Sequence, residues 1–215
     1  MDPVRFDTED GVSLEGELRR PEGDAQSAAV ICHPHPRRGG SKDHPLLWAI
    51  RNELARRGFV VLSFNFRGVM NSGGTYGGGR AEVRDVAAAI DRVGREVAGP
   101  PLLVGWSFGA SVALLEAVED ERLGALTLVG IPLRPRDFDV PPIPDEASLR
   151  SLRAPALLLA GERDEFCPPE ELRSLGERIR RCEVVVAAGT DHFFWRRERE
   201  AARVVGEFAD RSLAP

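Results

Sequence analysis

Short apolar runs that alternate with amphipathic stretches constrain the fold of this chain more than any other feature. Six runs of five to seven residues are bounded by glycine and proline and separated by stretches of helical periodicity: 28–32, 59–64, 102–106, 125–131, 156–161 and 183–188. Runs of this length suit strands that are buried on both faces, as in a parallel sheet. The sequence therefore predicts an α/β fold with right-handed crossover connections.

The remaining segments complete this prediction. Residues 4–7 and 12–18 flank Glu9-Asp10-Gly11, a pattern typical of an antiparallel hairpin. Helical patterns cover the longer stretches 45–58, 82–97, 168–180 and 197–213. Together they predict a mostly parallel central sheet of about eight strands, led by an antiparallel hairpin, with helices on both faces.

Length and composition are those of one globular domain spanning 1–215. The Pro-rich stretch 132–153 is interpreted as a short flap-like insertion, not a separate lid domain. The net charge of −5 argues against a nucleic-acid partner. No apolar run approaches the roughly 20 residues of a membrane-spanning helix, and residues 1–10 lack the apolar centre of a signal peptide. We therefore expect a cytoplasmic protein with no membrane partner, and the sequence leaves a homodimer open.

The segment 102–115 contains a G-x-S-x-G motif, Gly105-Trp106-Ser107-Phe108-Gly109, between a strand-like run and a helix-like stretch. A sharp strand-to-helix turn holds such a serine in a strained conformation with its hydroxyl exposed. Glycines fit on either side because neighbouring chain passes too close for a Cβ. The N-terminus of the following helix adds positive potential. Ser107 is therefore the candidate nucleophile.

A base and an acid for this serine are expected at the same edge of the sheet. A serine hydroxyl needs a base to remove its proton, and the base needs an orienting acid. Functional loops follow the carboxyl ends of strands, in the chain order serine, acid, histidine. His192 follows the last apolar run and is the only histidine in the second half of the chain. Asp164 follows the run before it, although four other carboxylates remain alternatives: Glu162, Glu165, Asp137 and Asp139.

These segments together resemble the α/β-hydrolase superfamily. The resemblance rests on the leading hairpin and on VICHPHP, FNFRGVMNSGG, GWSFG, AGERDEFCPP and GTDHFFW. The chain looks closest to small lidless members related to dienelactone hydrolases and short-chain esterases. This resemblance implies an α/β-hydrolase fold with nucleophile, acid and base at Ser107, Asp164 and His192. Dienelactone hydrolases themselves use a cysteine nucleophile, so their substrate class is not carried over to this chain.

The resemblance also implies an oxyanion hole made of two backbone amides. One is the N–H of Phe108, which follows the nucleophile. The other comes from the loop after the strand 28–32, in the segment HPHPR. Proline has no N–H, so the two prolines of this segment are excluded. His35 or Arg37 remains, with His35 at the favoured alignment.

Four further residues are candidates for substrate contact. Arg67 could bind an anionic group, although pairing with a carboxylate such as Asp85 is the favoured interpretation. Three aromatic side chains could touch substrate or pack the site: Tyr76, Trp106 and Phe193. The glycines within 73–79 lack the Lys-Ser/Thr end of a phosphate-binding loop, which predicts a mobile surface loop.

The leading hypothesis is a serine hydrolase that cleaves a small-molecule carboxylic ester or thioester through an acyl-enzyme, without a cofactor or metal. An acyltransferase, or a thioesterase-like cyclase in a biosynthetic pathway, would use the same residues. A non-catalytic binding protein is disfavoured because nucleophile, acid and base are all present in order. A metal hydrolase using His33 and His35 is disfavoured because no further ligand cluster follows at metal-binding spacing. The three cysteines also lack the spacing of a zinc site or of a disulfide framework.

Overall fold

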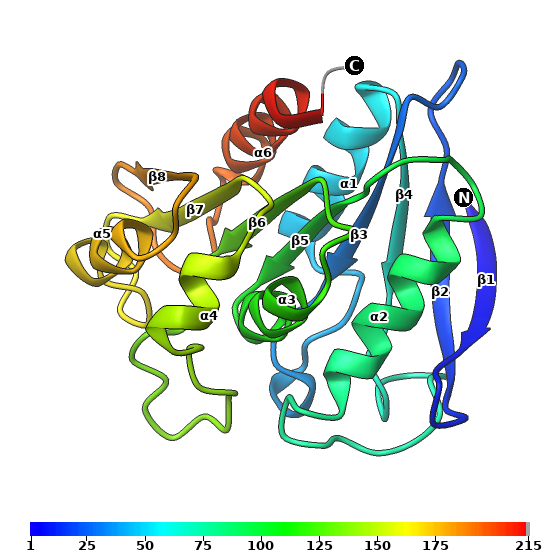
Figure 1. The fold of residues 1–215 in the computed structure, drawn as a ribbon, viewed down its shortest axis with the longest axis horizontal. Helices are drawn as coiled ribbons and strands as arrows, with labels where there is room; N and C mark the ends of the chain where they lie inside the picture. Colours follow the sequence, from blue (N-terminus) through cyan, green and yellow to red (C-terminus); the bar gives the residue numbers. More distant parts are fainter. Residues whose placement is uncertain (214–215) are drawn as a thin grey trace.

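An eight-stranded sheet forms the centre of the molecule (Figure 1). The computed structural model describes residues 1–213. Its strands are β1 (Asp2–Asp7), β2 (Ser13–Arg19), β3 (Ser27–Cys32), β4 (Phe59–Phe64), β5 (Leu102–Trp106), β6 (Ala125–Val129), β7 (Ala156–Gly161) and β8 (Cys182–Ala187). The strand order is β1-β2-β4-β3-β5-β6-β7-β8. β1 pairs with β2, and β2 with β4, in antiparallel fashion, whereas the other neighbours are parallel.

Helices cover both faces of this sheet. They are the short 3₁₀ helix η1 (Pro36–Arg38), α1 (Pro45–Arg56), α2 (Glu82–Val93), α3 (Phe108–Glu119), α4 (Glu146–Ser151), α5 (Pro169–Glu177) and α6 (Glu198–Leu213). α1 and α6 pack against each other on one face, and α2 and α3 lie on the other (Figure 1). Each face has its own buried apolar cluster. The predicted α/β fold, with its leading hairpin and helices on both faces, is confirmed.

The central strands are buried along their whole length, which explains why their sequences show no polar alternation. Every residue of β4, β5, β6 and β7 is buried. β3 is the central strand, because it pairs with β4 on one side and with β5 on the other. The carboxyl ends of β3, β5, β6, β7 and β8 therefore meet at one edge of the sheet.

Several elements end earlier than the sequence pattern predicts, β6 and α2 among them. β6 ends at Val129, because Gly130 has a φ of +52° and turns the chain out of the sheet. Ile131 lies outside the strand but is fully buried, which explains why the apolar run in the sequence continues past the end of β6. α2 ends at Val93, four residues before the predicted end at 97, and Gly94 follows it.

The insertion 132–153 consists of a stretch without regular secondary structure, followed by α4. The Asp145 carboxylate caps α4 by accepting a hydrogen bond from the Ser148 N–H at 2.8 Å. Leu149 is its buried residue. The sequence did not predict α4, because one buried leucine leaves no helical period to detect. We call residues 132–145 the flap.

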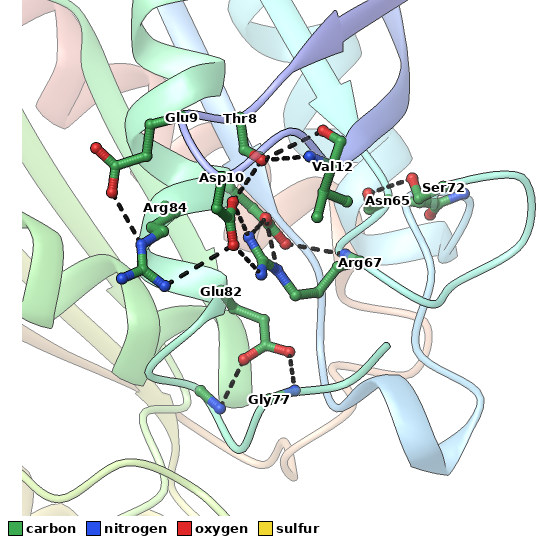
Figure 2. A network of polar contacts seen from close by, with 12 residues as sticks. Thr8, Glu9, Asp10, Val12, Asn65, Arg67, Ser72, Gly77, Glu82 and Arg84 are labelled. Carbon is green, nitrogen blue, oxygen red and sulfur yellow. Dashed lines mark hydrogen bonds and ion pairs between the residues drawn. The ribbon is translucent and has the colours of Figure 1, made fainter. Parts of the chain in front are cut away.

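An ion-pair network ties the loop 65–80 to the hairpin and to α2 (Figure 2). The Arg67 guanidinium donates to Asp85 at 2.9 and 2.7 Å and to Asp10 at 2.8 and 3.1 Å. The Glu82 carboxylate accepts hydrogen bonds from two glycine N–H groups of the loop at 2.7 Å each. These contacts tie the glycine-rich segment, which lies at the surface as its composition predicts, to the start of α2. Within residues 1–213, no helix combines the length and apolar composition needed to cross a bilayer.

Candidate active site

Ser107 lies at the sharp turn between β5 and α3, with φ 55° and ψ −122°. Its N–H donates to the Val129 carbonyl of the neighbouring strand at 2.9 Å. A Cβ on Gly105 would lie 2.3 Å from the Gly109 carbonyl oxygen, and one on Gly109 would lie 2.4 Å from that of Cys32. Both positions therefore require glycine. The strain and the flanking glycines expected of this motif are both present, and the hydroxyl is half-buried at the start of α3.

The structure brings Ser107, His192 and Asp164 into one hydrogen-bonded line. The Ser107 Oγ lies 3.0 Å from His192 Nε2, and His192 Nδ1 lies 2.8 Å from Asp164 Oδ2. The other carboxylate oxygen of Asp164 accepts hydrogen bonds from the Phe166 and Cys167 N–H groups at 2.9 and 3.0 Å. The turn after β7 thus fixes the carboxylate, and the carboxylate orients the imidazole.

The hydrogen-bond partners determine which ring nitrogen of His192 carries the proton. An ionised carboxylate only accepts hydrogen bonds, so Nδ1 is protonated and donates to Asp164. Nε2 of the neutral ring is then left to accept from the Ser107 hydroxyl. Asp164 and His192 are 3% and 7% exposed, so little water competes for these bonds. An arrangement of this kind can activate a serine as a nucleophile.

Gly130 leaves room for the hydrogen bond between Asp164 and His192, and it was not identified from the sequence. It has a φ of +52°, and a Cβ there would lie 3.1 Å from both Asp164 Oδ2 and the His192 ring. A glycine at the carboxyl end of a buried apolar run is the signal that would have identified it. Trp106 also holds the histidine loop, because its indole Nε1 donates to the His192 carbonyl at 3.2 Å.

The other carboxylates considered for the position of Asp164 are directed elsewhere. Glu162 accepts a hydrogen bond from a backbone N–H of the loop after β8 at 2.8 Å. Glu165 pairs with an arginine of the flap at 2.8 Å. Asp137 and Asp139 lie in the flap itself. Asp164 is the carboxylate that contacts His192.

Two backbone N–H groups beside Ser107 are free of protein acceptors within residues 1–213, those of His35 and Phe108. Phe108 is the first residue of α3, where the helix offers no internal partner for an N–H. The alternative donor, Arg37, gives its N–H to His35 Nδ1 at 3.2 Å. His35 and Phe108 both line the cavity described below.

The rings of His33 and His35 make hydrogen bonds within the protein. Nε2 of His33 accepts from the Phe66 N–H at 3.0 Å, and Nδ1 lies 2.6 Å from the Pro34 carbonyl oxygen. Burial lowers the pKa of His33 to about 4, so the ring is neutral at physiological pH. His35 Nε2 lies 3.0 Å from the Asp139 carbonyl oxygen. Both nitrogens of each ring are engaged, which leaves no lone pair for a metal ion.

A cavity of about 270 Å³ opens beside Ser107 and His192. Its walls are mainly aromatic: Trp106, Phe108, Phe138, Phe166, Phe193 and Trp195. Trp106 and Phe193 are two of the four residues considered for substrate contact. Phe138, Phe166 and Trp195 come from three separate loops, and no local pattern in the sequence indicates that they meet.

Arg67 and Tyr76, the other two candidates for substrate contact, lie outside this cavity. Arg67 is 5% exposed and committed to Asp85 and Asp10. The Tyr76 hydroxyl donates to the Asp139 carbonyl at 2.6 Å, and its ring packs behind His35. Neither side chain lines the cavity at Ser107, so the structure does not place either of them where it could contact a substrate.

Comparison with known proteins agrees with the fold. A model of the alpha/beta hydrolase domain matches residues 27–211. The structure of an α/β serine hydrolase homologue from Coxiella burnetii has a TM-score of 0.84 at 29% identity, over 96% of each chain. An α/β serine hydrolase without a lid from Xanthomonas campestris has a TM-score of 0.82 at 26% identity, over 99% of this chain and 95% of that one. An uncharacterized protein from Rickettsia prowazekii is 24% identical over 97% of this chain and 88% of its own length. The chain belongs to the α/β-hydrolase family.

Proposed function

We propose that this protein is a serine hydrolase that cleaves a carboxylic ester or thioester through a covalent acyl-enzyme. One observation carries the proposal: the hydrogen-bonded line from Asp164 through His192 to Ser107 ends at an open cavity. Its distances of 2.8 and 3.0 Å are within the range for proton transfer. The same geometry on a closed surface would have no route for a substrate.

In the first half of the reaction, Ser107 Oγ attacks the carbonyl carbon of the substrate while its proton moves to His192 Nε2. Asp164 stabilises the resulting imidazolium through the Nδ1 hydrogen bond. The tetrahedral intermediate then collapses, and the leaving alcohol or thiol takes the proton from Nε2. Ser107 is left as an ester of the acyl group.

In the second half, water takes the place of the leaving group. His192 Nε2 removes one proton from the water as its oxygen attacks the acyl carbon. The second tetrahedral intermediate expels Ser107 Oγ, which recovers the proton from the imidazolium. The carboxylic acid leaves, and the enzyme returns to its starting state.

The negative oxygen of each intermediate is assigned to the N–H groups of His35 and Phe108. Both lack protein acceptors within residues 1–213, and both line the cavity. The N-terminus of α3 adds its positive end at the same place. Donors held ready for a developing oxyanion contribute several kcal/mol to transition-state stabilisation, because they need no reorganisation during the reaction.

The experiment is a panel of 4-nitrophenyl esters and acyl thioesters of graded acyl length, with Ser107→Ala as the matched control. We expect the wild type to hydrolyse short members and to be labelled by a fluorophosphonate probe. Ser107→Ala should lose labelling and at least about 10⁴-fold in rate. Product analysis with added alcohols and amines measures whether water or another acceptor takes the acyl group. A folded wild type that resists the probe would overturn the proposal.

A further inference from the structure

Among residues 1–213, a single arginine is the only residue with a permanently charged side chain that lines the Ser107 cavity. Arg38 lies on the wall, and within residues 1–213 no aspartate, glutamate or lysine lines it. No carboxylate of this part of the chain lies within ion-pair distance of Arg38, whereas Arg136 of the nearby flap pairs with Glu165 at 2.8 Å. The exposed Arg38 guanidinium is thus available to a ligand.

The backbone around Arg38 is fixed by the turn that also presents His35. The Arg38 and Gly40 N–H groups both donate to the His35 carbonyl, at 3.0 and 3.1 Å. Gly39 has a φ of +79°, and a Cβ on Gly40 would lie 2.1 Å from the carbonyl oxygen of Pro34. This tight turn requires glycine at both positions and holds Arg38 at a fixed place relative to the His35 N–H.

The guanidinium itself is positioned by an aromatic ring of the flap. Its central carbon lies 4.8 Å from the centroid of Phe138, which also lines the cavity. A cation held over a ring keeps its N–H groups free at the edges to donate hydrogen bonds. The aromatic walls lower the local dielectric constant, so an ionic contact inside the cavity is stronger than one at an open surface.

We infer that Arg38 recognises a negatively charged group of the substrate, a carboxylate or phosphate, and so makes this enzyme selective for anionic esters or thioesters. The inference rests on the proposed function, since it names the substrate class of the same site. A guanidinium binds either oxyanion through paired N–H donors. An aromatic-walled cavity with one cation accommodates an apolar body that bears one negative charge.

Arg37 provides a matched control. It lies next to Arg38, is also exposed, and has no carboxylate within ion-pair distance in residues 1–213. It lines an adjoining pocket together with Arg38, Asp137 and Asp139, but unlike Arg38 it does not line the Ser107 cavity. A general effect of positive charge near the site would appear in variants of both arginines, whereas specific recognition would appear only in those of Arg38.

The experiment compares esters that differ in charge and are matched in carbon skeleton. For the acyl side, the 4-nitrophenyl monoester of glutaric acid is compared with 4-nitrophenyl pentanoate. For the leaving-group side, the butyrate ester of 4-hydroxybenzoate is compared with that of 4-hydroxybenzamide. The measured quantity is the ratio of kcat/KM for the anionic ester to that for its neutral match. Because both rates come from one preparation, a partly folded variant does not change the ratio.

We expect the wild-type ratio to exceed one for at least one pair and to fall with rising salt. Arg38→Gln should lower that ratio about tenfold, because one charge-assisted contact is lost. Arg38→Lys should retain part of it, and Arg37→Gln should match the wild type. The pair that responds identifies whether the anion belongs to the acyl or the leaving group.

The inference is overturned if the neutral esters are hydrolysed in a Ser107-dependent manner but neither ratio changes in Arg38→Gln. It is also overturned if Arg37→Gln lowers the ratio equally. In both results the serine hydrolase itself stands. If neither neutral nor anionic esters of the full panel are hydrolysed, the proposed function fails and the inference fails with it.

Discussion

Ser107 adopts a left-handed backbone conformation that costs a non-glycine residue about 1–3 kcal/mol. The surrounding chain holds it there: the Ser107 N–H is bonded to β6, and the first turn of α3 packs directly on the end of β3. Gly109 makes that approach possible, because its Cα faces the carbonyl oxygens of Cys32 and His33. The position of the hydroxyl therefore depends on a residue that does not line the cavity.

Gly109→Ala tests this dependence. The added Cβ would lie 2.4 and 2.6 Å from two backbone carbonyl oxygens, which cannot move aside as a side chain can. We expect the free energy of unfolding to fall by about 3 kcal/mol, because the start of α3 must shift. The hydrolysis rate of the folded fraction should fall by about 100-fold, because Ser107 shifts with it. Gly23→Ala is the control, since a Cβ there meets nothing within 4 Å. Equal stability of the two variants would contradict the argument.

Glu116 is a buried carboxyl on α3 that takes no part in the proposed reaction. Burial, together with the nearby charges of Asp120 and Glu119, raises its pKa from 4.5 to about 7. The folded chain therefore holds a proton that the unfolded chain releases between about pH 4.5 and 7. Over that window stability falls as pH rises, because the folded state binds more protons. This loss of stability is absent below about pH 4.5 and complete above about pH 7.

Glu116→Gln removes this cost without changing the size of the side chain. Relative to wild type, the variant should gain up to about 3 kcal/mol of unfolding free energy between pH 4.5 and 8. Urea unfolding of both proteins at several pH values measures the difference. The titration of His33, whose pKa is lowered by burial, is common to both and cancels. Parallel pH profiles would show that folding does not raise the pKa of Glu116.

At the scale of elements, a carbonyl group joins three segments that are distant in sequence. The Asp139 carbonyl oxygen of the flap accepts from the Tyr76 hydroxyl at 2.6 Å and lies 3.0 Å from Nε2 of His35. It links the flap to the loop 65–80 and to the turn that presents the His35 N–H. The flap therefore contacts the site through a backbone carbonyl group as well as through the ring of Phe138.

Tyr76→Phe removes one of these donors and keeps the ring that packs on His35 and Phe108. We expect a loss of about 1 kcal/mol in stability, because one hydrogen bond is removed. We also expect faster trypsin cleavage after Arg136, which is exposed in the flap. Cleavage after Arg178, outside the flap, serves as the internal reference. Unchanged cleavage at Arg136 would mean that the Tyr76 hydroxyl does not restrain the flap.

The elements of the sheet could be predicted from sequence because a fully buried strand is an uninterrupted apolar run. Where the apolar pattern fails to mark an element correctly, the structure also gives a physical reason. Ile131 is apolar and buried but lies outside β6, since Gly130 turns the chain, and α4 contributes one buried leucine. The positions of Ser107, His192 and Asp164 could be predicted because each residue lies in a loop that follows the carboxyl end of a strand. The walls of the cavity come from side chains that only the folded chain brings together, so Arg38 and Phe138 carry no local signal.

At the scale of the whole molecule, the leading hairpin provides carboxylates to cations on other elements. Asp10 pairs with Arg67 of the loop 65–80, and Glu17 pairs with Lys42 at 2.8 Å and with Arg51 of α1 at 3.1 Å. Arg51 is 2% exposed, and its Nε has no hydrogen-bond partner among residues 1–213. β2 is thus held to the molecule by charge as well as by its place beside β4.

Glu17→Gln tests how far this attachment supports the whole chain. The substitution keeps the shape but removes the negative charge, so the buried guanidinium of Arg51 loses its carboxylate partner. We expect the free energy of unfolding to fall by about 3 kcal/mol, because an uncompensated buried charge is left behind. The loss should appear as a lower urea midpoint of one shared transition, since the sheet is continuous from β1 to β8. Glu22→Gln, an exposed position in the next turn, should leave the midpoint within error. A separate early transition confined to the hairpin would instead show that β1 and β2 unfold independently of the hydrolase core.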